Sequence, residues 1–248
     1  MVVQHNLTAM NSNRMLGLTT KTQAKSTEKL SSGYKINRAA DDAAGLSISE
    51  KMRSQIRGLN KAASNAQDGI SLVQVAEGAL NETHSILQRM NELATQAAND
   101  TNTSVDREAI QQEMNQLTSE IDRIQSTTQF NSMNLLDGTF SSKALKLQVG
   151  AMSGQSISVS IAKMSASKLG LAGTDGKVSL KVSAFSSAGA AMKTIQDAIK
   201  TVSDTRSKLG AIQNRLEHTI NNLNTTSENT QAAESRIRDT DMASEMVE

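Results

Sequence analysis

Apolar residues recur at every seventh position through a long stretch in the first half of the chain. The column comprises Met52, Leu59, Ala66, Val73, Leu80, Leu87 and Ala94. Ile56, Ala63 and Ile70 add the alternating four- and three-residue spacing beside it. This spacing is typical of the apolar seam of a coiled coil, and it predicts one helix from Leu46 to Ala98. At about 1.5 Å per residue the helix is roughly 80 Å long, which exceeds the helices of ordinary globular domains.

Two further helices carry the same spacing. Residues 99–103 break the first helix, and Thr103 or Ser104 is expected to cap the second, with Asp106 placed to complete a capping box with Thr103. The apolar columns are Ile110, Met114, Leu117, Ile121 and Ile124 in the second helix and Ile195, Val202, Leu209, Leu216 and Leu223 in the third. The third column fails at Thr230, after a stretch rich in Asn and Thr that predicts a hinge at 221–229.

Between the second and third helices the apolar period falls from about 3.6 to 2. The alternation predicts three short strands, at 145–149, 157–161 and 178–182, separated by glycine-containing turns. The first thirty residues are only loosely periodic and predict a weaker helix. The expected fold is therefore mainly α: a coiled-coil bundle of long helices that forms a rod, with a small β-hairpin region.

Composition narrows the function classes. The 248 residues include 26 Lys and Arg against 25 Asp and Glu, so the net charge of +1 does not suggest nucleic acid as a partner. The absence of cysteine excludes disulfides and thiol catalysis, and the absence of proline lets helices run without interruption. No apolar run reaches the roughly 18 residues of a membrane span, and the amino terminus lacks the apolar block of a cleavable signal.

The residues that usually carry catalysis are not clustered. His5, His84 and His218 have no second histidine at metal-binding spacing, so no metal or other cofactor is expected. Asp41 and Asp42 are adjacent, so they suit the start of a helix better than a facing catalytic pair. A hydrolase in the strand region would need clustered catalytic groups that residues 131–189 do not contain. The chain is not expected to be an enzyme.

Three segments resemble the terminal signatures of bacterial flagellins. Residues 28–53 read EKLSSGYKINRAADDAAGLSISEKMR and are similar to the amino-terminal signature. Residues 209–223, LGAIQNRLEHTINNL, and 232–243, AAESRIRDTDMA, are similar to the carboxy-terminal signature. Similar segments therefore bracket nearly the whole chain.

The resemblance implies a division of the chain into four parts. Residues 1–31 are an amino-terminal inner-core helix, 32–45 a spoke, 46–224 a helical rod with the β-hairpin region at about 131–189, and 225–248 a carboxy-terminal inner-core helix. The two ends would pair, and large outer variable domains would be absent. Flagellins continue past the Glu-Met-Val-Glu segment with an amphipathic tail, so a sequence that ends at Glu248 is expected to be truncated and to assemble only weakly.

The family's role implies a structural subunit that polymerises helically with other flagellin subunits into the filament used for swimming. Export would be in the unfolded state through the flagellar export apparatus, with addition beneath the cap, so the mature location is secreted and extracellular. The residues expected to carry assembly are Leu7, Met10, Leu18, Leu30, Ile237 and Met242 in the inner core and Ile36, Asn37, Arg38, Asp41 and Asp42 in the spoke. Binding of the export chaperone depends on the tail, which lies outside this sequence.

The resemblance also implies recognition by Toll-like receptor 5, a receptor of innate immunity. The matching residues are Gln88, Arg89, Glu92, Leu93 and Glu113. An exposed arginine beside a leucine would give an anchor with both charge and apolar area. Met90 and Asn91 depart from the Val-Arg of strongly activating members, which leaves the strength of activation open. The alternative is that this patch serves only contacts between rods.

Two other roles remain compatible with the sequence. A hook–filament junction protein shares the terminal helices but assembles as a single layer, and the strong carboxy-terminal signature favours a flagellin over it. An engineered, monomeric, flagellin-derived receptor ligand is the other alternative, because the expected truncation would disable polymerisation.

Overall fold

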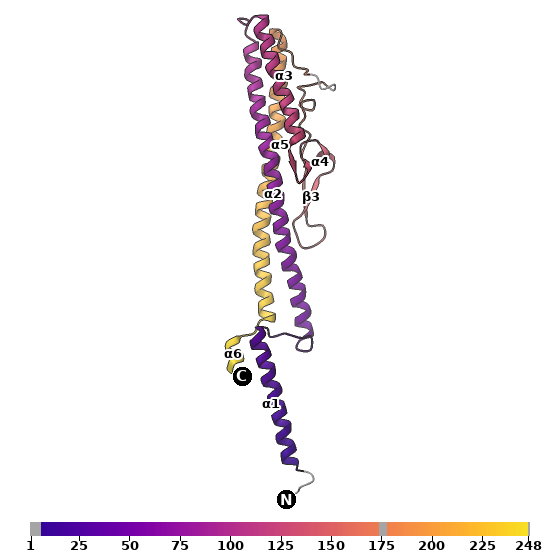
Figure 1. The fold of residues 1–248 in the computed structure, drawn as a ribbon, viewed down its shortest axis with the longest axis vertical. Coiled ribbons are helices and arrows are strands. Elements are labelled where there is room, and N and C mark those ends of the chain that lie inside the picture. The colour runs from indigo at the N-terminus through magenta and orange to yellow at the C-terminus, as the bar shows by residue number, and fades with distance from the viewer. Residues whose placement is uncertain (1–5, 174–177, 248) are drawn as a thin grey trace. The chain divides into compact units, whose positions relative to one another are not determined.

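The computed structural model describes residues 6–173 and 178–247, and most of them are helical (Figure 1). The helices are α1 (Leu7–Ser32), α2 (Ala43–Ala97), α3 (Ser104–Thr127), α4 (Thr139–Ser142), α5 (Phe185–Arg238) and α6 (Met242–Val247). The strands are β1 (Gln129–Phe130), β2 (Met133–Asn134), β3 (Leu145–Gln148) and β4 (Ser156–Val159). The chain divides into two compact units: unit 1 is Met1–Asn60 with Leu223–Glu248, and unit 2 is Lys61–Asn222. The expectation of a mainly helical bundle with a small hairpin region is confirmed.

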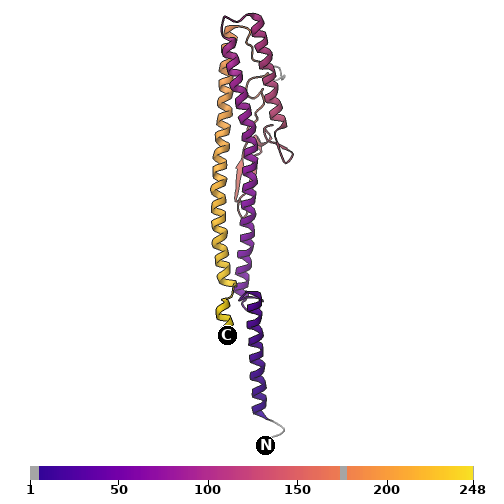
Figure 2. The same ribbon diagram turned by 60° about the vertical axis from the view of Figure 1, so that its left-hand side comes forward.

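Unit 2 is built on the two predicted seams. The five seam residues of α2 that fall in unit 2, Ala66, Val73, Leu80, Leu87 and Ala94, are fully buried, and so are Ile195, Val202, Leu209 and Leu216 on α5. In both ribbon views the unit 2 parts of α2 and α5 run side by side (Figures 1 and 2). α3 covers them with Ile110, Met114 and Ile121, which are also buried. Heptad spacing therefore predicted the core correctly.

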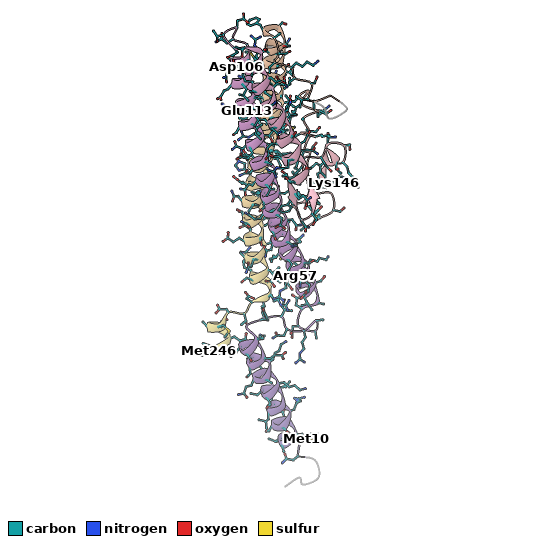
Figure 3. All side chains as sticks on the ribbon, turned by 45° about the horizontal axis from the view of Figure 1, so that its top comes forward. Met10, Arg57, Asp106, Glu113, Lys146 and Met246 are labelled. Atoms are coloured by element: carbon teal, nitrogen blue, oxygen red, sulfur yellow. The ribbon has the colours of Figure 1, made fainter. Side chains whose placement is uncertain are left out.

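The ends of the long helices have local causes. At the start of α3 the Thr103 side chain accepts from the N–H of Asp106, whose carboxylate accepts in turn from the N–H of Thr103 (Asp106 is labelled in Figure 3). The predicted capping box is therefore confirmed. α1 ends at Gly33, whose φ of 75° is left-handed and suits glycine. The predicted hinge at 221–229 is wrong as a helix break, because α5 continues through Arg238.

Two of the three predicted strands are present. β3 pairs antiparallel with β4, with Leu145 opposite Val159 and Gln148 opposite Ser156, and β1 pairs with β2 in a second hairpin. β3 and β4 carry the alternation of residues 145–149 and 157–161, with Ile157 and Val159 buried.

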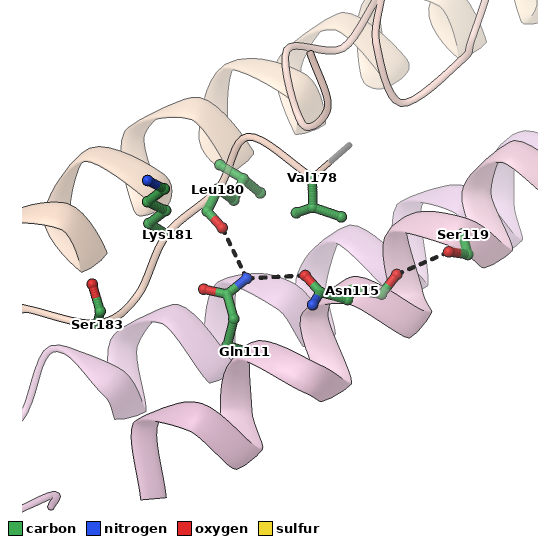
Figure 4. Close-up of a pocket in the computed structure, with 7 residues that line it drawn as sticks. All are labelled: Gln111, Asn115, Ser119, Val178, Leu180, Lys181 and Ser183. Atoms are coloured by element: carbon green, nitrogen blue, oxygen red, sulfur yellow. Dashed lines mark hydrogen bonds between the residues drawn. The ribbon is translucent and has the colours of Figure 1, made fainter. Parts of the chain in front are cut away.

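The predicted strand at 178–182 is reduced to one isolated bridge, in which Val178 pairs with Ala172, and beyond this bridge the segment bonds to a side chain. The Gln111 amide nitrogen donates to the carbonyl of Leu180 over 2.9 Å (Figure 4). The N–H of Val182 donates to the Gln111 carbonyl oxygen over 3.0 Å. One amide on α3 thus replaces the two hydrogen bonds that a neighbouring strand would make. Leu180 and Val182 are still buried, so their alternation reports burial rather than strand pairing.

Candidate interaction sites

The spoke residues form a hydrogen-bonded turn in unit 1. The Asp41 carboxylate accepts from the backbone N–H groups of Asn37 and Arg38, at 3.3 and 3.0 Å, and lies 3.0 Å from Lys25 Nζ. The Lys25 ammonium, followed by the Arg38 N–H, holds the pKa of Asp41 below its usual range. Ile36 is buried beneath this turn, 3% exposed. The turn is therefore fixed by one carboxylate and one apolar side chain.

Asp42 starts the next helix, as the sequence predicts. Its carboxylate accepts from the N–H groups of Ala44 and Gly45, at 3.1 and 2.9 Å, in the first turn of α2. Asp41 and Asp42 thus have separate structural tasks and do not form a carboxylate pair.

The expected inner-core residues differ in exposure. On α1, Leu7, Met10 and Leu18 are 76%, 65% and 55% exposed, and no residue of the helix is buried (Met10 is labelled in Figure 3). Leu30 near the end of α1 and Ile237 near the end of α5 are half-buried, and Met242 at the start of α6 is exposed. The apolar surface of α1 is thus open along most of its length.

α6 packs against α1 through an ion pair. Lys29 Nζ lies 3.0 and 3.1 Å from the two carboxylate oxygens of Glu245, a residue that is only 8% exposed. The Lys29 ammonium keeps the pKa of Glu245 below its usual range. This pairing spans 216 positions of the chain, so no local sequence signal could have indicated it.

Sequence reasoning also missed a set of side chains around the only tyrosine. Arg53 donates to Glu234 over 3.0 Å and Arg238 donates to Glu50 over 2.8 Å, pairs separated by 181 and 188 positions. Both guanidinium groups approach the ring of Tyr34. The one available signal was the isolated aromatic residue in the spoke, since the chain has one Tyr and no Trp.

The residues expected to meet a receptor lie in unit 2, on α2 and α3. Arg89 lies 3.0 Å from Glu113 on α3 and 3.2 Å from Glu92 one turn along α2 (Glu113 is labelled in Figure 3). Its side chain is 52% exposed. The Glu113 carboxylate, and after it that of Glu92, raises the pKa of the guanidinium. Gln88 contacts the His84 ring over 3.0 Å. Four of the five expected residues thus present polar groups from one area.

Leu93 does not belong to that exposed surface. It is 2% exposed and lies in the unit 2 core, so the expectation of an apolar anchor beside the arginine is corrected. The next apolar neighbour, Met90, is fully buried as well. The face around Arg89 is consequently polar, and Leu93 acts by holding α2 in the core.

Nothing in the described part of the chain suggests a catalytic or metal site. Among residues 6–173 and 178–247 no group of three His, Cys, Asp or Glu could hold a metal ion. A groove of about 540 Å³ lies beside the Gln111 amide that bonds to Leu180, and it is lined by Asn115, Ser119 and Lys181 among others (Figure 4). It contains no carboxylate, histidine or paired nucleophile. Within the same described ranges no helix is both long and apolar enough to cross a membrane.

Comparison with known proteins covers both ends of the chain. The family model of the bacterial flagellin N-terminal helical region matches residues 3–141, and that of the C-terminal helical region matches residues 192–248. A flagellin of Halalkalibacterium halodurans is 55% identical over 250 residues, which cover 100% of this chain and 89% of that protein. A flagellin of Bacillus subtilis is 50% identical over 275 residues, which cover 100% of this chain and 90% of that protein.

Solved structures agree with this assignment. The crystal structure of Bacillus cereus flagellin is 32% identical, with a TM-score of 0.55 over 69% of this chain and 94% of that chain. A putative flagellar hook-associated protein of Vibrio parahaemolyticus gives a TM-score of 0.66 over 80% of this chain and 100% of that chain. Its identity of 16% makes that likeness one of fold alone. The resemblance of the terminal signatures is confirmed: this chain belongs to the bacterial flagellin family, and it is a structural protein of the flagellum rather than an enzyme.

Proposed function

We propose that this chain polymerises with further copies of itself into the helical filament that serves as the propeller for swimming. The observation that carries the proposal is the open apolar surface of α1, where Leu7, Met10 and Leu18 are all more than half exposed. A surface of this kind marks a site of association, because a partner would remove it from water. Contacts between different surfaces of neighbouring copies propagate as an open helix when the rotation from one copy to the next does not close a ring.

The spoke residues have a supporting part in this proposal. Asn37, Arg38 and Asp41 fix the turn that follows α1, and Ile36 fills the space beneath it. Leu30, Ile237 and Met242 extend the proposed assembly surface. A hook–filament junction role has only a likeness of fold in its favour, so helical polymerisation is the better-supported function.

Seeded elongation tests the proposal. Short filament fragments of a related flagellin are mixed with this chain, with its Leu18→Asp variant, and with a Gln23→Asp control at an exposed polar position of the same helix. With the amphipathic carboxy-terminal helix of that flagellin added to all three, the parent chain and the control should lengthen the fragments in electron micrographs, and Leu18→Asp should not. Equal growth by Leu18→Asp would remove the role of the α1 surface, and a parent chain that never elongates the fragments would contradict polymerisation.

The proposal includes delivery through the flagellar export apparatus, in an unfolded state, and addition beneath the cap outside the cell. The family membership and the lack of cysteine support this route. A chain without disulfides has no covalent cross-link that would stop it from passing unfolded through a narrow channel. Cells with the apparatus should release the chain into the medium, and cells without it should retain the chain. Release by both would contradict this route.

We also propose that Toll-like receptor 5 recognises unit 2 at the surface formed by Gln88, Arg89, Glu92 and Glu113, with Leu93 as support inside the core. Two carboxylates hold the exposed Arg89 guanidinium in one position, so little side-chain entropy remains to be lost on binding. Arginine anchors of this kind are common among binding hot spots.

A matched pair of arginines tests this proposal. Arg89→Asp should weaken receptor binding by on the order of tenfold or more. Arg123→Asp is the control, because Arg123 is a comparably exposed arginine that pairs with Glu120 on α3. Equal loss in both variants would indicate a general charge effect, and no loss in Arg89→Asp would contradict the assigned surface.

A further inference from the structure

A short antiparallel backbone bridge in unit 1 joins the segment after α1 to the segment after α5. The N–H of Lys35 donates to the carbonyl of Arg238 over 2.7 Å, and the N–H of Thr240 donates to the carbonyl of Gly33 over 3.0 Å. The two bonds flank Tyr34, which is the centre of an isolated β-bridge. Even a complete two-stranded hairpin is only marginally stable in water, so this bridge needs support from side chains.

Tyr34 supplies contacts of the required kind. Arg53 Cζ lies 5.5 Å and Arg238 Cζ 4.9 Å from the centre of its ring, both within cation–π range. Arg53 Nη2 also donates a hydrogen bond to the Tyr34 hydroxyl oxygen over 3.2 Å. Arg53 belongs to α2 and Arg238 to α5, so one ring contacts the charged groups of two helices.

Two carboxylates hold the guanidinium groups beside the ring. Glu234 accepts from Arg53 Nε over 3.0 Å, and its side chain is only 10% exposed. Glu50 accepts from Arg238 Nη1 over 2.8 Å, and the Arg238 side chain is 12% exposed. The hydrogen bond to the Tyr34 oxygen, together with the Glu234 charge, raises the pKa of Arg53 above its usual value, although burial acts in the opposite direction. The two carboxylates thus hold the cations beside the ring.

Apolar burial gives the bridge little alternative support. In the described part of unit 1 the buried apolar side chains are Ile36 and Leu223, and of these only Ile36 belongs to the segment that the bridge holds. Closure of the bridge therefore depends on the tyrosine ring and its two cations.

We propose that Tyr34, Arg53 and Arg238 form a latch that couples the amino-terminal segment to the end of α5. With the ring against the two guanidinium groups the latch is closed, and both backbone hydrogen bonds form. With the ring withdrawn both bonds open together, and the segment before Ile36 separates from the end of α5. The pairing of α2 with α5 in unit 2 does not require the latch. This device is independent of the proposed polymerisation.

Amide hydrogen exchange of the full chain at neutral pH tests the latch. In Tyr34→Leu the amides of Lys35 and Thr240 should exchange about tenfold faster, because both cation–π contacts are lost. Tyr34→Phe keeps the ring but not the hydroxyl, and should retain most of the protection. Arg38→Gln is the control, since it removes an exposed ion pair of the same spoke and should leave both amides unchanged.

The coupling has a second, independent readout. Because Arg238 acts through the ring, the double variant Tyr34→Leu with Arg238→Gln should open the bridge little further than Tyr34→Leu alone. Additive effects would contradict the latch, and so would unchanged protection in Tyr34→Leu. Equal losses in Tyr34→Phe and Tyr34→Leu would assign the bridge to the hydroxyl alone. Faster exchange at Leu87 in unit 2 would show general unfolding instead of latch opening, and would overturn the proposal.

Discussion

Units 1 and 2 each contain part of α2 and part of α5, but the contacts inside unit 1 differ from those inside unit 2. In unit 2 the side chains of Leu80, Leu87 and Ile195 are completely buried, because α3 and the β-hairpins cover the seam between the long helices. In unit 1 the seam residues Met52 and Leu59 are only half-buried. The same heptad spacing therefore gives a dry core only where further elements cover the two helices.

Charged side chains take over where the covering elements are missing. In unit 1 carboxylates join different elements, as in the pairs of Lys29 with Glu245 and Arg53 with Glu234. In unit 2 the carboxylates with lowered pKa values bond locally, as Glu120 does to Arg123 and Asp106 to the cap residue of α3. Ion pairs between helices of unit 2, such as Arg89 with Glu113, join elements that an apolar core already holds. Apolar burial responds little to pH and salt, whereas exposed ion pairs respond to both. The two units should consequently differ in how solution conditions affect them.

The largest effect is expected from a truncated side chain in unit 2. Leu87→Ala should lower the free energy of unfolding by about 2–5 kcal/mol, because it leaves a cavity at a fully buried position. Leu18→Ala in unit 1 should change it by less than about 0.5 kcal/mol, because that side chain is 55% exposed. Chemical denaturation followed by circular dichroism measures both, and similar values for the two variants would contradict the contrast between the units.

The sequence predicted the parts of the molecule that depend on local patterns. The seams, the Thr103 capping box and the Asp42 helix start each follow from residues within one or two turns of a helix. The strand at 178–182 is reduced to a bridge at Val178 because the Gln111 side chain takes the hydrogen bonds of Leu180 and Val182, and a period of two cannot distinguish such a partner from another strand. α5 continues as a helix through the predicted hinge at 221–229, where Leu223 and Ser227 are buried.

The candidate sites were predictable only in part. The family resemblance implied that Arg89 and Glu113 belong to one patch, and the structure brings the two side chains together at 3.0 Å. The burial of Leu93 was not foreseen, because the seam residue Ala94 beside it does not show how wide the buried face of α2 is. The Tyr34 latch was missed because its partners lie far away along the chain.

A smaller effect is expected when the side chain that replaces a strand is removed. Gln111→Ala should cost about 1–3 kcal/mol of unfolding free energy, because it removes the partners of the Leu180 carbonyl and the Val182 N–H. Gln112→Ala is the control, because the side chain of Gln112, the next residue in the sequence, is exposed. Thermal or chemical denaturation distinguishes them. If the two variants lose the same stability, the Gln111 amide does not hold residues 178–182 in place.

The smallest effect is expected at the ion pair between α1 and α6. Lys29→Gln should speed amide exchange in α6 and leave the unit 2 core unchanged, because the pair is one of the contacts that dock α6 on α1. About 1 M salt should act on the parent chain in the same direction, since screening is then effective within a few ångströms. Insensitivity of α6 to both changes would place its docking on apolar contacts instead.

Acid titration of amide protection factors tests the contrast between the units most directly. Glu50 and Glu245 have pKa values held below the ordinary 4.5 by Arg238 and Lys29, so their contribution is complete above that pH and is lost as pH falls through the lowered values. The account predicts that α6 and the bridge amides of Lys35 and Thr240 lose protection below about pH 4.5 while Leu87 keeps its own. Simultaneous loss in both units, or acid-resistant protection in unit 1, would contradict it.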